Sequence, residues 1–516
     1  MKLTKLLCLL LATVLFAVPL WSCDGGMDDD NVGGGGINED GSVSWSDVDF
    51  KGAAVRFGIS VDEESGKSCT FKPAKEYLMG PDAATTDEVL KKVAARNAKV
   101  ENDLNMKVQY VELTAMGGYE SVQEDIKNKV LGSSSDAPDI YNNDLRAFTL
   151  VLLKGYLMNV ANPADKNGNA LASYLDFESE AWNYPFMSEM TFDKSKVYVL
   201  AGDFHIDMIR MAQVLFVNKT MFEQNAAVLG YEDTATFYRY VDAGDWDYDR
   251  LVNMCDSIWQ DNGTEKNKAD LSDGRVGLVI NDRFYFNFVP ATGLSTYYMD
   301  KEGKPRFIES IDEMNRLGNK IRQISSQNGE GDGIYYQSKL NCITTFMQSN
   351  VLFAPATLGE LESDELRNAS FEKGLVPIPK YDYKRQDAYH TMVEMYAEIS
   401  AVLVNAPSFT RASAYLQYVN DKSDDVLSEY YEFSLKFKYN EDPAIRSMID
   451  LVYGTIDSPF GIWFETVILS YVTLTGDTIT LHHAISKNSL SQFYDANAQA
   501  YRAGLEKALE DFADLP

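Results

Sequence analysis

Apolar and polar positions along the first 160 residues follow two different periods. Residues 54–60 and 106–111 are short runs rich in β-branched and aromatic residues, which predicts strands. Residues 86–104 and 119–131 repeat apolar side chains every three to four positions, which predicts helices. A further short strand and helix are predicted over 139–153. Strands that alternate with helices predict an α/β fold, with a parallel sheet covered by helices on both faces.

The rest of the chain extends this pattern. Residues 197–200, 214–217 and 276–280 are predicted strands, and the chain is mainly helical from 407 onward, except around 471–481. Parallel sheets of this kind bind their ligands beyond the carboxyl ends of the strands. Candidate binding residues are therefore sought where the predicted strands end.

The first residues form an export signal. A basic head with Lys2 and Lys5 precedes an apolar run over 6–18, which is too short to span a bilayer comfortably, and Cys23 follows. This order resembles a bacterial lipobox, which implies a signal peptide over 1–22 and lipid attachment at Cys23; ordinary cleavage and free secretion is the alternative. Either way we expect the protein outside the cytoplasm, and in the first case on the extracellular face of the cell membrane.

Residues 23–47 are rich in Gly and Asp and poor in apolar side chains, which predicts a flexible tether. The folded body that follows is strongly acidic. Loss of Lys2 and Lys5 with the signal takes the 47 basic residues to 45, against 77 acidic ones, a net charge of −32. Such a charge repels phosphate backbones, so nucleic acid is not an expected partner.

Motifs for catalysis, metals and cofactors are missing from the sequence. There is no H-E-x-x-H, no G-x-S-x-G and no phosphate loop, so we expect neither an enzyme nor a cofactor. His482 and His483 would point to opposite faces of a strand, so no metal site is predicted there. The remaining cysteines, Cys69, Cys255 and Cys342, are widely spaced and odd in number, which favours buried free thiols over a disulfide framework.

Several local patterns occur in a characteristic order along residues 50–510. They are Ala137-Pro-Asp-Ile140, then Val217-Asn-Lys219, then Gly244-Asp-Trp246, and then Pro377-Ile-Pro-Lys380. In this order and spacing the chain resembles the bacterial extracellular solute-binding protein family 1, the carbohydrate-type lipoproteins of ABC importers. The chain departs from the family pattern at Val217, Asp247 and Ile378, where the family usually has Tyr, Thr and Leu.

The resemblance implies a periplasmic-binding-protein-like fold of two α/β lobes joined by hinge strands. Lobe 1 is expected over 48–205 and 351–397, and lobe 2 over 206–350 and 398–516, with crossovers near Asp203, Asn350 and Ala397. A carbohydrate ligand is expected in the cleft between the lobes, and the transmembrane subunits of an ABC permease are the implied partner.

A carbohydrate site needs aromatic rings for stacking and planar polar groups for pairs of hydroxyls. Asn143, Asp144 and Arg146 follow the third strand, where the resemblance implies an Asp–Arg pair that holds hydroxyls. A helix cap at Asn143 or Asp144 is the alternative. Asp203 and His205 lie on the expected first crossover.

Further candidates come from later segments. Trp182 is a possible cleft aromatic, and Trp246 is expected in the core instead. The resemblance places stacking aromatics after the strand that ends at Ile280, which selects Tyr285 with either Arg283 or Asn287. Two more segments complete the set of candidate ligand-binding residues, namely Glu394 with Tyr396 on a crossing strand and Trp463 in a late aromatic segment.

Two other functions are compatible with an exported, aromatic-rich chain. A surface glycan-binding lipoprotein of another fold would be mostly helical and would lack the early strand–helix–strand units. A secreted glycoside hydrolase would need two carboxylates across a cleft. The early alternation of strands and helices favours the solute-binding protein over the first alternative. Among 77 acidic residues some carboxylates will lie near one another, so pairing alone does not argue for the second.

Overall fold

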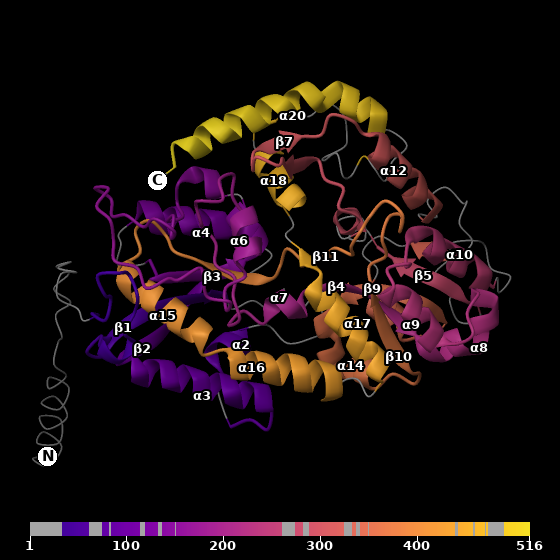
Figure 1. The fold of residues 1–516 in the computed structure, drawn as a ribbon, viewed down its shortest axis with the longest axis horizontal. Helices are drawn as coiled ribbons and strands as arrows, with labels where there is room; N and C mark the ends of the chain where they lie inside the picture. The colour runs from indigo at the N-terminus through magenta and orange to yellow at the C-terminus, as the bar shows by residue number, and fades with distance from the viewer. Residues whose placement is uncertain are drawn as a thin grey trace, which may run out of the picture.

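The computed structural model describes residues 34–60, 75–81, 84–113, 119–132, 137–149, 151–260, 274–281, 288–324, 333–336, 341–348, 350–438, 442–457, 460–469, 471–472, 484 and 490–515. The two large sheets of this part of the chain each form the centre of one lobe (Figure 1). None of its helices has the length and apolar character that crossing a membrane requires.

The first sheet has the strand order β12-β3-β1-β2. Its strands are β1 (Ala53–Ser60), β2 (Met106–Leu113), β3 (Ile140–Asp144) and β12 (Glu398–Ala401). β1 pairs in parallel with β2 and β3, and β12 adds antiparallel to β3. The helices of this lobe include α2 (Lys75–Met79), α3 (Glu88–Asp103), α4 (Tyr119–Leu131), α5 (Leu145–Thr149), η5 (Leu152–Lys154), α6 (Tyr184–Glu189), α15 (Phe409–Asp421) and α16 (Asp424–Ser428).

The second sheet has the order β10-β4-β9-β5-β8. Its strands are β4 (Gln213–Asn218), β5 (Val276–Ile280), β8 (Ile334–Tyr336), β9 (Val351–Thr357) and β10 (Lys373–Pro377). β4 runs antiparallel to both neighbours, whereas β5 is parallel to β8 and β9. The surrounding helices are α8 (Lys219–Leu229), α9 (Thr234–Asp242), α10 (Tyr248–Ile258), α13 (Cys342–Phe346), η8 (Leu358–Glu362), α14 (Asp364–Arg367) and α17 (Pro443–Gly454).

The strand pairing corrects the expected lobe boundaries after residue 350. β9 and β10 pair with β4, so 351–377 belongs to the second lobe and not to the first. β12 pairs with β3, so 398–401 belongs to the first lobe. Asn350 is accordingly no crossover. The local pattern of an apolar strand does not specify its partner, because the partner lies far away in the sequence.

Within the described residues the chain passes between the two lobes at three places. The first is α7 (Asp207–Arg210), which lies between the sheets in Figure 1. The second runs from β11 (Thr391–Met392), which pairs with β13 (Ile456–Asp457), into β12. The third is η9, a π-helix over Glu429–Lys438, which follows α16 on the first lobe and leads to α17 on the second.

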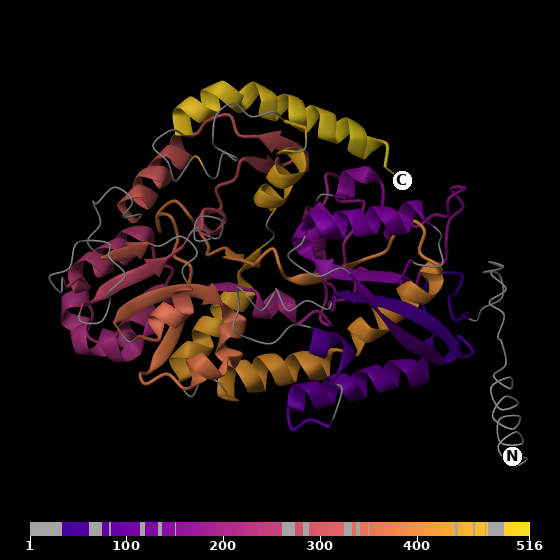
Figure 2. The same ribbon diagram turned by 180° about the vertical axis from the view of Figure 1, so that it is seen from behind.

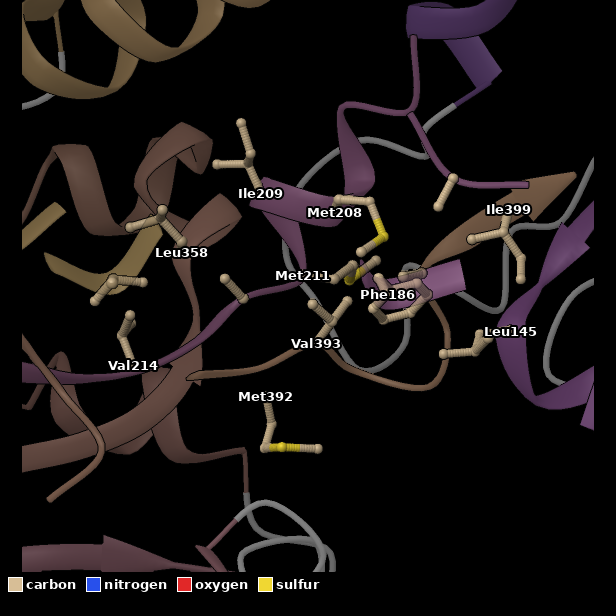
Figure 3. Close-up of a cluster of buried hydrophobic side chains, with 14 of the residues drawn as sticks. Leu145, Phe186, Met208, Ile209, Met211, Val214, Leu358, Met392, Val393 and Ile399 are labelled. Carbon is tan, nitrogen blue, oxygen red and sulfur yellow. The ribbon is translucent and has the colours of Figure 1, made fainter. Parts of the chain in front are cut away.

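A buried apolar cluster surrounds the first two crossings (Figure 3). Met208 and Met211 lie beside Phe186, and Val393 lies below them in the view. Towards the first lobe the cluster contains Leu145 and Ile399, and towards the second it contains Val214, Leu358 and Met392. The two lobes therefore share one core at the hinge.

A third group of elements connects the lobes on another side. It consists of the η6 turn (Pro290–Thr292), the hairpin β6 (Tyr297–Met299) and β7 (Pro305–Phe307), and the helices α12 (Asp312–Ile324), α18 (Phe460–Leu469) and α20 (Leu490–Ala513). Both ribbon views show α20 running from α12 and the hairpin to the first lobe, where its C-terminal end lies (Figures 1 and 2).

The end of the predicted tether is packed on the first lobe, which corrects its expected extent. Trp45, in the short helix η2 (Trp45–Asp47), stacks on Tyr174 with ring centroids 5.7 Å apart and lies 4.8 Å from the ring of Tyr418. Gly36 has φ +78°, and a Cβ there would lie 2.7 Å from the carbonyl oxygen of Ser44. Residues 34–47 are thus part of the folded body, and residues 23–33 lie outside the described part.

Most predicted elements occur at their expected places. The exceptions include 197–200, where only Leu200 forms a bridge, to Ser400, and the helix predicted over 145–153, which divides into α5 and η5. The interpretation of Trp246 as a core residue is confirmed, because it is fully buried and Asp247 caps α10 through the Arg250 amide. Cys255 and Cys342 are buried free thiols, and Cys69 lies outside the described residues.

Candidate interlobe ligand site

A pocket of about 300 Å³ lies where the first crossing leaves the first lobe. Residues of both lobes and of the hinge helix α7 line it. They are Glu180, Trp182, Asn183, Pro185, Gly202, Asp203, His205, Met208, Ile209, Leu427, Tyr453 and Ile456. Three of these, Trp182, Asp203 and His205, are among the ligand-binding residues predicted from the sequence.

Local sequence features shape the first-lobe wall of the pocket. Asn183 caps α6 by accepting a hydrogen bond from the Phe186 amide at 3.3 Å, and Pro185 in the first turn suits that position. Gly202 lets α15 approach closely, because a Cβ there would lie 2.4 Å from Asn420 Oδ1. Gly202 also forms a bridge with Trp182, which holds the 180–185 segment against the crossing.

Two aromatic residues line the pocket, one from each lobe. Trp182 is 3% exposed and donates from Nε1 to Gln417 Oε1 at 2.8 Å, so its ring is fixed in place. Tyr453, at the end of α17, is 37% exposed and comes from the second lobe. A pair of rings on two lobes can contact the apolar face of a ligand from both sides as the lobes close.

Asp203 supplies the main charge of the pocket. Its amide donates to the Ala181 carbonyl at 2.9 Å, while its carboxylate forms no hydrogen bond or ion pair with another described residue. Burial, with the charges of Asp424 and Asp421, raises the pKa of Asp203 to about 7. A half-buried carboxylate without a partner is a feature of binding and catalytic sites.

His205 joins the pocket to the first sheet. Its Nε2 lies 3.0 Å from Ser400 Oγ and 3.2 Å from Asn142 Oδ1, and its Nδ1 accepts from the Gly202 amide at 3.4 Å. Burial, with the charge of Arg96, lowers the pKa of His205 to about 3. The imidazole is therefore neutral and holds the crossing against β3 and β12, which makes it a positioning group.

The other predicted residues of the first lobe form a second group at the β3–β12 edge. The Leu145 amide donates to the Ala397 carbonyl and the Arg146 amide to the Met395 carbonyl, which brings Arg146 beside Glu394 and Tyr396. These three side chains are half-buried. Glu394 Oε2 also accepts a hydrogen bond from Gln213 Nε2 at 2.8 Å. Their role in ligand binding stays a prediction.

Asn143, Asp144 and Trp463 require correction. Asn143 and Asp144 are fully buried, and Asp144 Oδ1 caps α5 by accepting from the Ala147 amide at 2.7 Å, so the cap interpretation is confirmed. Trp463 is also fully buried and packs against Phe464 within α18. None of the three offers a surface to a ligand in this conformation. Arg283, Tyr285 and Asn287 lie outside the described residues.

A buried ionic network beside the pocket has no counterpart in the sequence predictions. Arg210, fully buried in α7, binds Asp207 through Nη1 at 2.8 Å and Glu362 through Nε at 2.9 Å. Tyr430 of the π-helix donates to Glu362 at 2.6 Å, and the Arg210 guanidinium lies 4.7 Å from the ring centre of Tyr77. This network ties all three parts, the first lobe, the hinge and the second lobe, together.

The described residues contain no group of three or more His, Cys, Asp or Glu that could hold a metal ion. The pocket residues that the sequence analysis missed, such as Tyr453 and Leu427, come from helices far downstream of the crossing. Only Asn183 had a local signal, since an Asn followed closely by Pro is typical of a helix start.

No family model matches the sequence, and no curated protein matches it. Solved structures do match the fold. The galacto-N-biose-/lacto-N-biose I-binding protein of the ABC transporter from Bifidobacterium longum, in complex with lacto-N-biose, is 12% identical, with 90% of this chain and 98% of that chain covered and a TM-score of 0.53.

Two further solved structures were found at lower similarity. RafE from Streptococcus pneumoniae in its apo form is 12% identical, with 88% and 98% of the two chains covered and a TM-score of 0.48. The maltose/maltodextrin-binding domain MalE from Bdellovibrio bacteriovorus bound to maltotriose is 12% identical, with 89% and 100% covered and a TM-score of 0.46.

The first match supports the architecture derived from the strand pairing. Its similarity extends over nearly the whole of both chains, so it includes both lobes and the crossings between them. The chain therefore has the two-lobed, periplasmic-binding-protein-like fold found in the solute-binding proteins of ABC transporters.

Proposed function

We propose that the protein is an extracellular solute-binding protein that captures a carbohydrate between its lobes and delivers it to an ABC importer. The observation that supports this most directly is the pocket at the hinge, which both lobes line with an aromatic residue each, together with carboxylate and amide groups. Such a combination suits a small molecule with an apolar ring face and several hydroxyls. The galacto-N-biose-/lacto-N-biose I-binding protein, to which the fold is similar, is in complex with lacto-N-biose.

The mechanism is capture and release, without cleavage of a bond. The ligand first contacts Trp182, Asn183 and Asp203 on the first lobe, and closure brings Tyr453 and Ile456 of the second lobe onto it. Closure is favourable only to the extent that the ligand binds the closed form more tightly than the open form. The closed form then presents both lobes to the transmembrane subunits of the permease.

The N-terminal segment fits this function. A lipid on Cys23 would hold the protein at the outer face of the membrane, and residues 24–33 would connect that lipid to the packed segment that begins at Gly34. Mass spectrometry of the protein from its membrane, before and after removal of the first residues by protease, tests for the lipid.

Ligand binding is tested by thermal-shift screening of the purified protein against neutral and charged sugars, followed by titration calorimetry of each hit. Tyr453→Ala should weaken binding about 10-fold, because a ring contact contributes about 1–1.5 kcal/mol. Tyr383→Ala is the matched control, since Tyr383 is 39% exposed and lies outside the pocket. If no sugar raises the melting temperature, the proposal fails.

A reducing-sugar assay on each hit separates capture from hydrolysis. Glu180 and Asp203 both line the pocket, and a carboxyl with a raised pKa can act as a general acid. A solute-binding protein should leave an oligosaccharide ligand intact, so release of reducing ends that Asp203→Asn abolishes would indicate a glycosidase instead.

A further inference from the structure

The charged side chains that line the pocket are all acidic. Glu180 and Asp203 are its two ionisable acids, and neither Lys nor Arg is among the residues that line it. Behind Asp203 lie Asp421, at the end of α15, and Asp424, at the start of α16, both close enough to act on its ionisation. His205, the one potentially basic side chain of the lining, is neutral because burial, with the charge of Arg96, lowers the pKa of its imidazole.

The carboxylates of this region differ in their hydrogen-bond and ion-pair partners. Asp421 accepts hydrogen bonds from Gln417 Nε2 at 2.8 Å and from Ser179 Oγ at 3.2 Å. Asp207, two residues beyond His205, binds Arg210. Asp203 has no such partner among the described residues, although it is only partly exposed and opens onto the pocket. A carboxylate withdrawn from water without a partner is unfavourable, and a ligand that brings a donor relieves this.

Tyr453 provides the second half of a cation site. Its ring is 37% exposed at the pocket, and burial together with the charge of Asp203 raises the pKa of its hydroxyl. Tyr453, from the second lobe, and Asp203, from the first, line the same pocket. A protonated amine between a tyrosine ring and a carboxylate is stabilised by both.

We propose that the pocket takes a small amino sugar, whose protonated amine binds Asp203 while Trp182 and Tyr453 contact the ring. The proposal rests on the proposed function and narrows its ligand from carbohydrates in general to cationic ones. A neutral hydroxyl could donate to Asp203, but it would leave the surrounding negative charge uncompensated. The pocket volume, about 300 Å³, is at the lower end of the range for ligand pockets, which suits a small ligand.

The test compares pairs of sugars that differ only in charge. Calorimetry at pH 8 measures the affinity of the full protein for 6-amino-6-deoxy hexoses of the gluco, galacto and manno series and for the matching hexoses. At this pH the amine of the sugar is protonated and the carboxyl group of Asp203 is ionised. We expect at least one amino sugar to bind 10-fold or more tightly than its hydroxyl counterpart, and the preference to weaken as salt is raised.

Asp203→Asn should abolish the preference, so that an amino sugar and its matching hexose bind the variant with equal affinity. Asp425→Asn is the matched control, because Asp425 lies on α16, is exposed and does not line the pocket. The preference should also fall between pH 8 and pH 5 as Asp203 takes up a proton. Single variants of the other titratable groups around it measure how much each contributes to this pH dependence; these groups are Glu180, Asp421, Asp424 and Tyr453.

Equal binding of amino and neutral sugars, or a preference that survives in Asp203→Asn, would overturn the proposal while the capture of a carbohydrate still stood. Absence of binding by every sugar of both kinds would instead count against the proposed function. Melting curves of each variant separate a lost site from a lost fold. Because the Asp203 carboxylate forms no hydrogen bond or ion pair within the described part of the chain, its replacement by Asn is expected to leave the fold intact.

Discussion

At the residue scale, Glu398 lies where the ionised form of its carboxyl group is disfavoured. The side chain is 2% exposed, and its Oε2 has no hydrogen-bond partner among the described residues. Burial, with the nearby charge of Asp207, raises the pKa of Glu398 well above its ordinary value of 4.5. A carboxyl whose pKa is higher in the folded than in the unfolded chain makes folding less favourable as the pH rises above the unfolded value.

Glu398→Gln should therefore make the protein more stable than the natural chain at pH 8. The advantage should grow by about 1.4 kcal/mol for each pH unit above 4.5, until Glu398 ionises in the folded state. Urea unfolding at pH 4.5, 6 and 8 measures it. Glu112→Gln, on an exposed position of β2, should show no such trend. A difference that stays constant with pH would mean that Glu398 is ionised in the fold.

Arg210 shows the opposite case, in which a buried charge is well satisfied. It is 0% exposed and binds Asp207 and Glu362, whose side chains are 2% and 8% exposed. Arg210→Met would leave two buried carboxylates without their cation, which should lower the free energy of unfolding by about 3–5 kcal/mol. Urea unfolding tests this, with Lys91→Met, from an exposed pair with Glu88, as the control. Equally small decreases in the free energy of unfolding of the two variants would contradict this prediction.

The predicted residues that the structure brings together at the pocket lie beside a single segment, and their role in ligand binding stays a prediction. Trp182, Asp203 and His205 come together because they flank one crossing. Tyr453 was missed since its approach depends on how α17 packs on the second lobe. Trp463 was misplaced, although Phe460–Leu469 has a single charged residue, and a helix that is apolar all round is usually buried. Asp144 shows that a polar residue at the end of a strand can cap the next helix as readily as it can bind a ligand.

At the element scale, the N-terminal segment over 34–50 is attached to the first lobe through Trp45 and through Val48 and Phe50, which are 3% and 0% exposed. Besides the ring contacts, Tyr174 donates its hydroxyl to the Gly35 carbonyl at 2.8 Å, and the Gly34 amide donates to the Asp49 carbonyl at 2.9 Å. Composition alone indicated a free tether here because the segment has few apolar residues. A few apolar side chains, Trp45, Val48 and Phe50, nevertheless pack it onto the first lobe.

Trp45→Ala should release this segment while the lobes stay folded. Amide exchange in residues 36–48 should become at least 10-fold faster, and the free energy of unfolding should fall by no more than about 1–2 kcal/mol. Ser46→Ala, at an exposed position next to Trp45, is the control and should leave exchange unchanged. If exchange in the variant stays slow, the backbone bonds to Asp49 and Ser44 hold the segment without the ring.

Elements were predictable where one period dominates a stretch, as in α3 and β1. The partner of a strand was not, which is why β9 and β10 were assigned to the wrong lobe. The π-helix over Glu429–Lys438 could not be distinguished from an α-helix by spacing of apolar residues alone. Its wider turn directs Tyr430 inward to Glu362 while Phe433 and Phe437 are more than half exposed, an arrangement set by packing between lobes.

At the scale of the whole molecule, the hinge must bend without losing its core. Three methionines, Met208, Met211 and Met392, belong to the cluster that both lobes share (Figure 3). Methionine has three rotatable bonds and adapts to changes in the space around it. The polar contacts of the hinge, in contrast, have fixed partners on both lobes, so we expect rotation to occur about the Arg210–Glu362 network with the apolar cluster adjusting around it.

Helix α20 contacts elements of both lobes, so we expect it to limit how far they separate. At one end Tyr494 and Tyr501 stack on Phe307 of the hairpin, and α12 beside it is tied to α10 of the second lobe by Lys320 and Asp249, 2.8 Å apart. At the other end Phe512, 4% exposed, packs against Phe192 and Tyr198 of the first lobe, with centroid distances of 5.3 and 5.9 Å. The helix is thus anchored to both lobes.

Phe512→Ala removes the larger part of the first-lobe anchor. Because the end of a helix can detach without unfolding the rest, the expected result is a wider range of lobe separations, and a stability loss below the 3–5 kcal/mol typical of a buried Phe. X-ray scattering should show a larger radius of gyration for the ligand-free variant, and amide exchange should rise in residues 505–515. Glu506→Gln, exposed on the same helix, should change neither. Faster exchange at an unchanged radius would show that α20 covers the lobes without restraining them, since the hinge contacts alone would then set their separation.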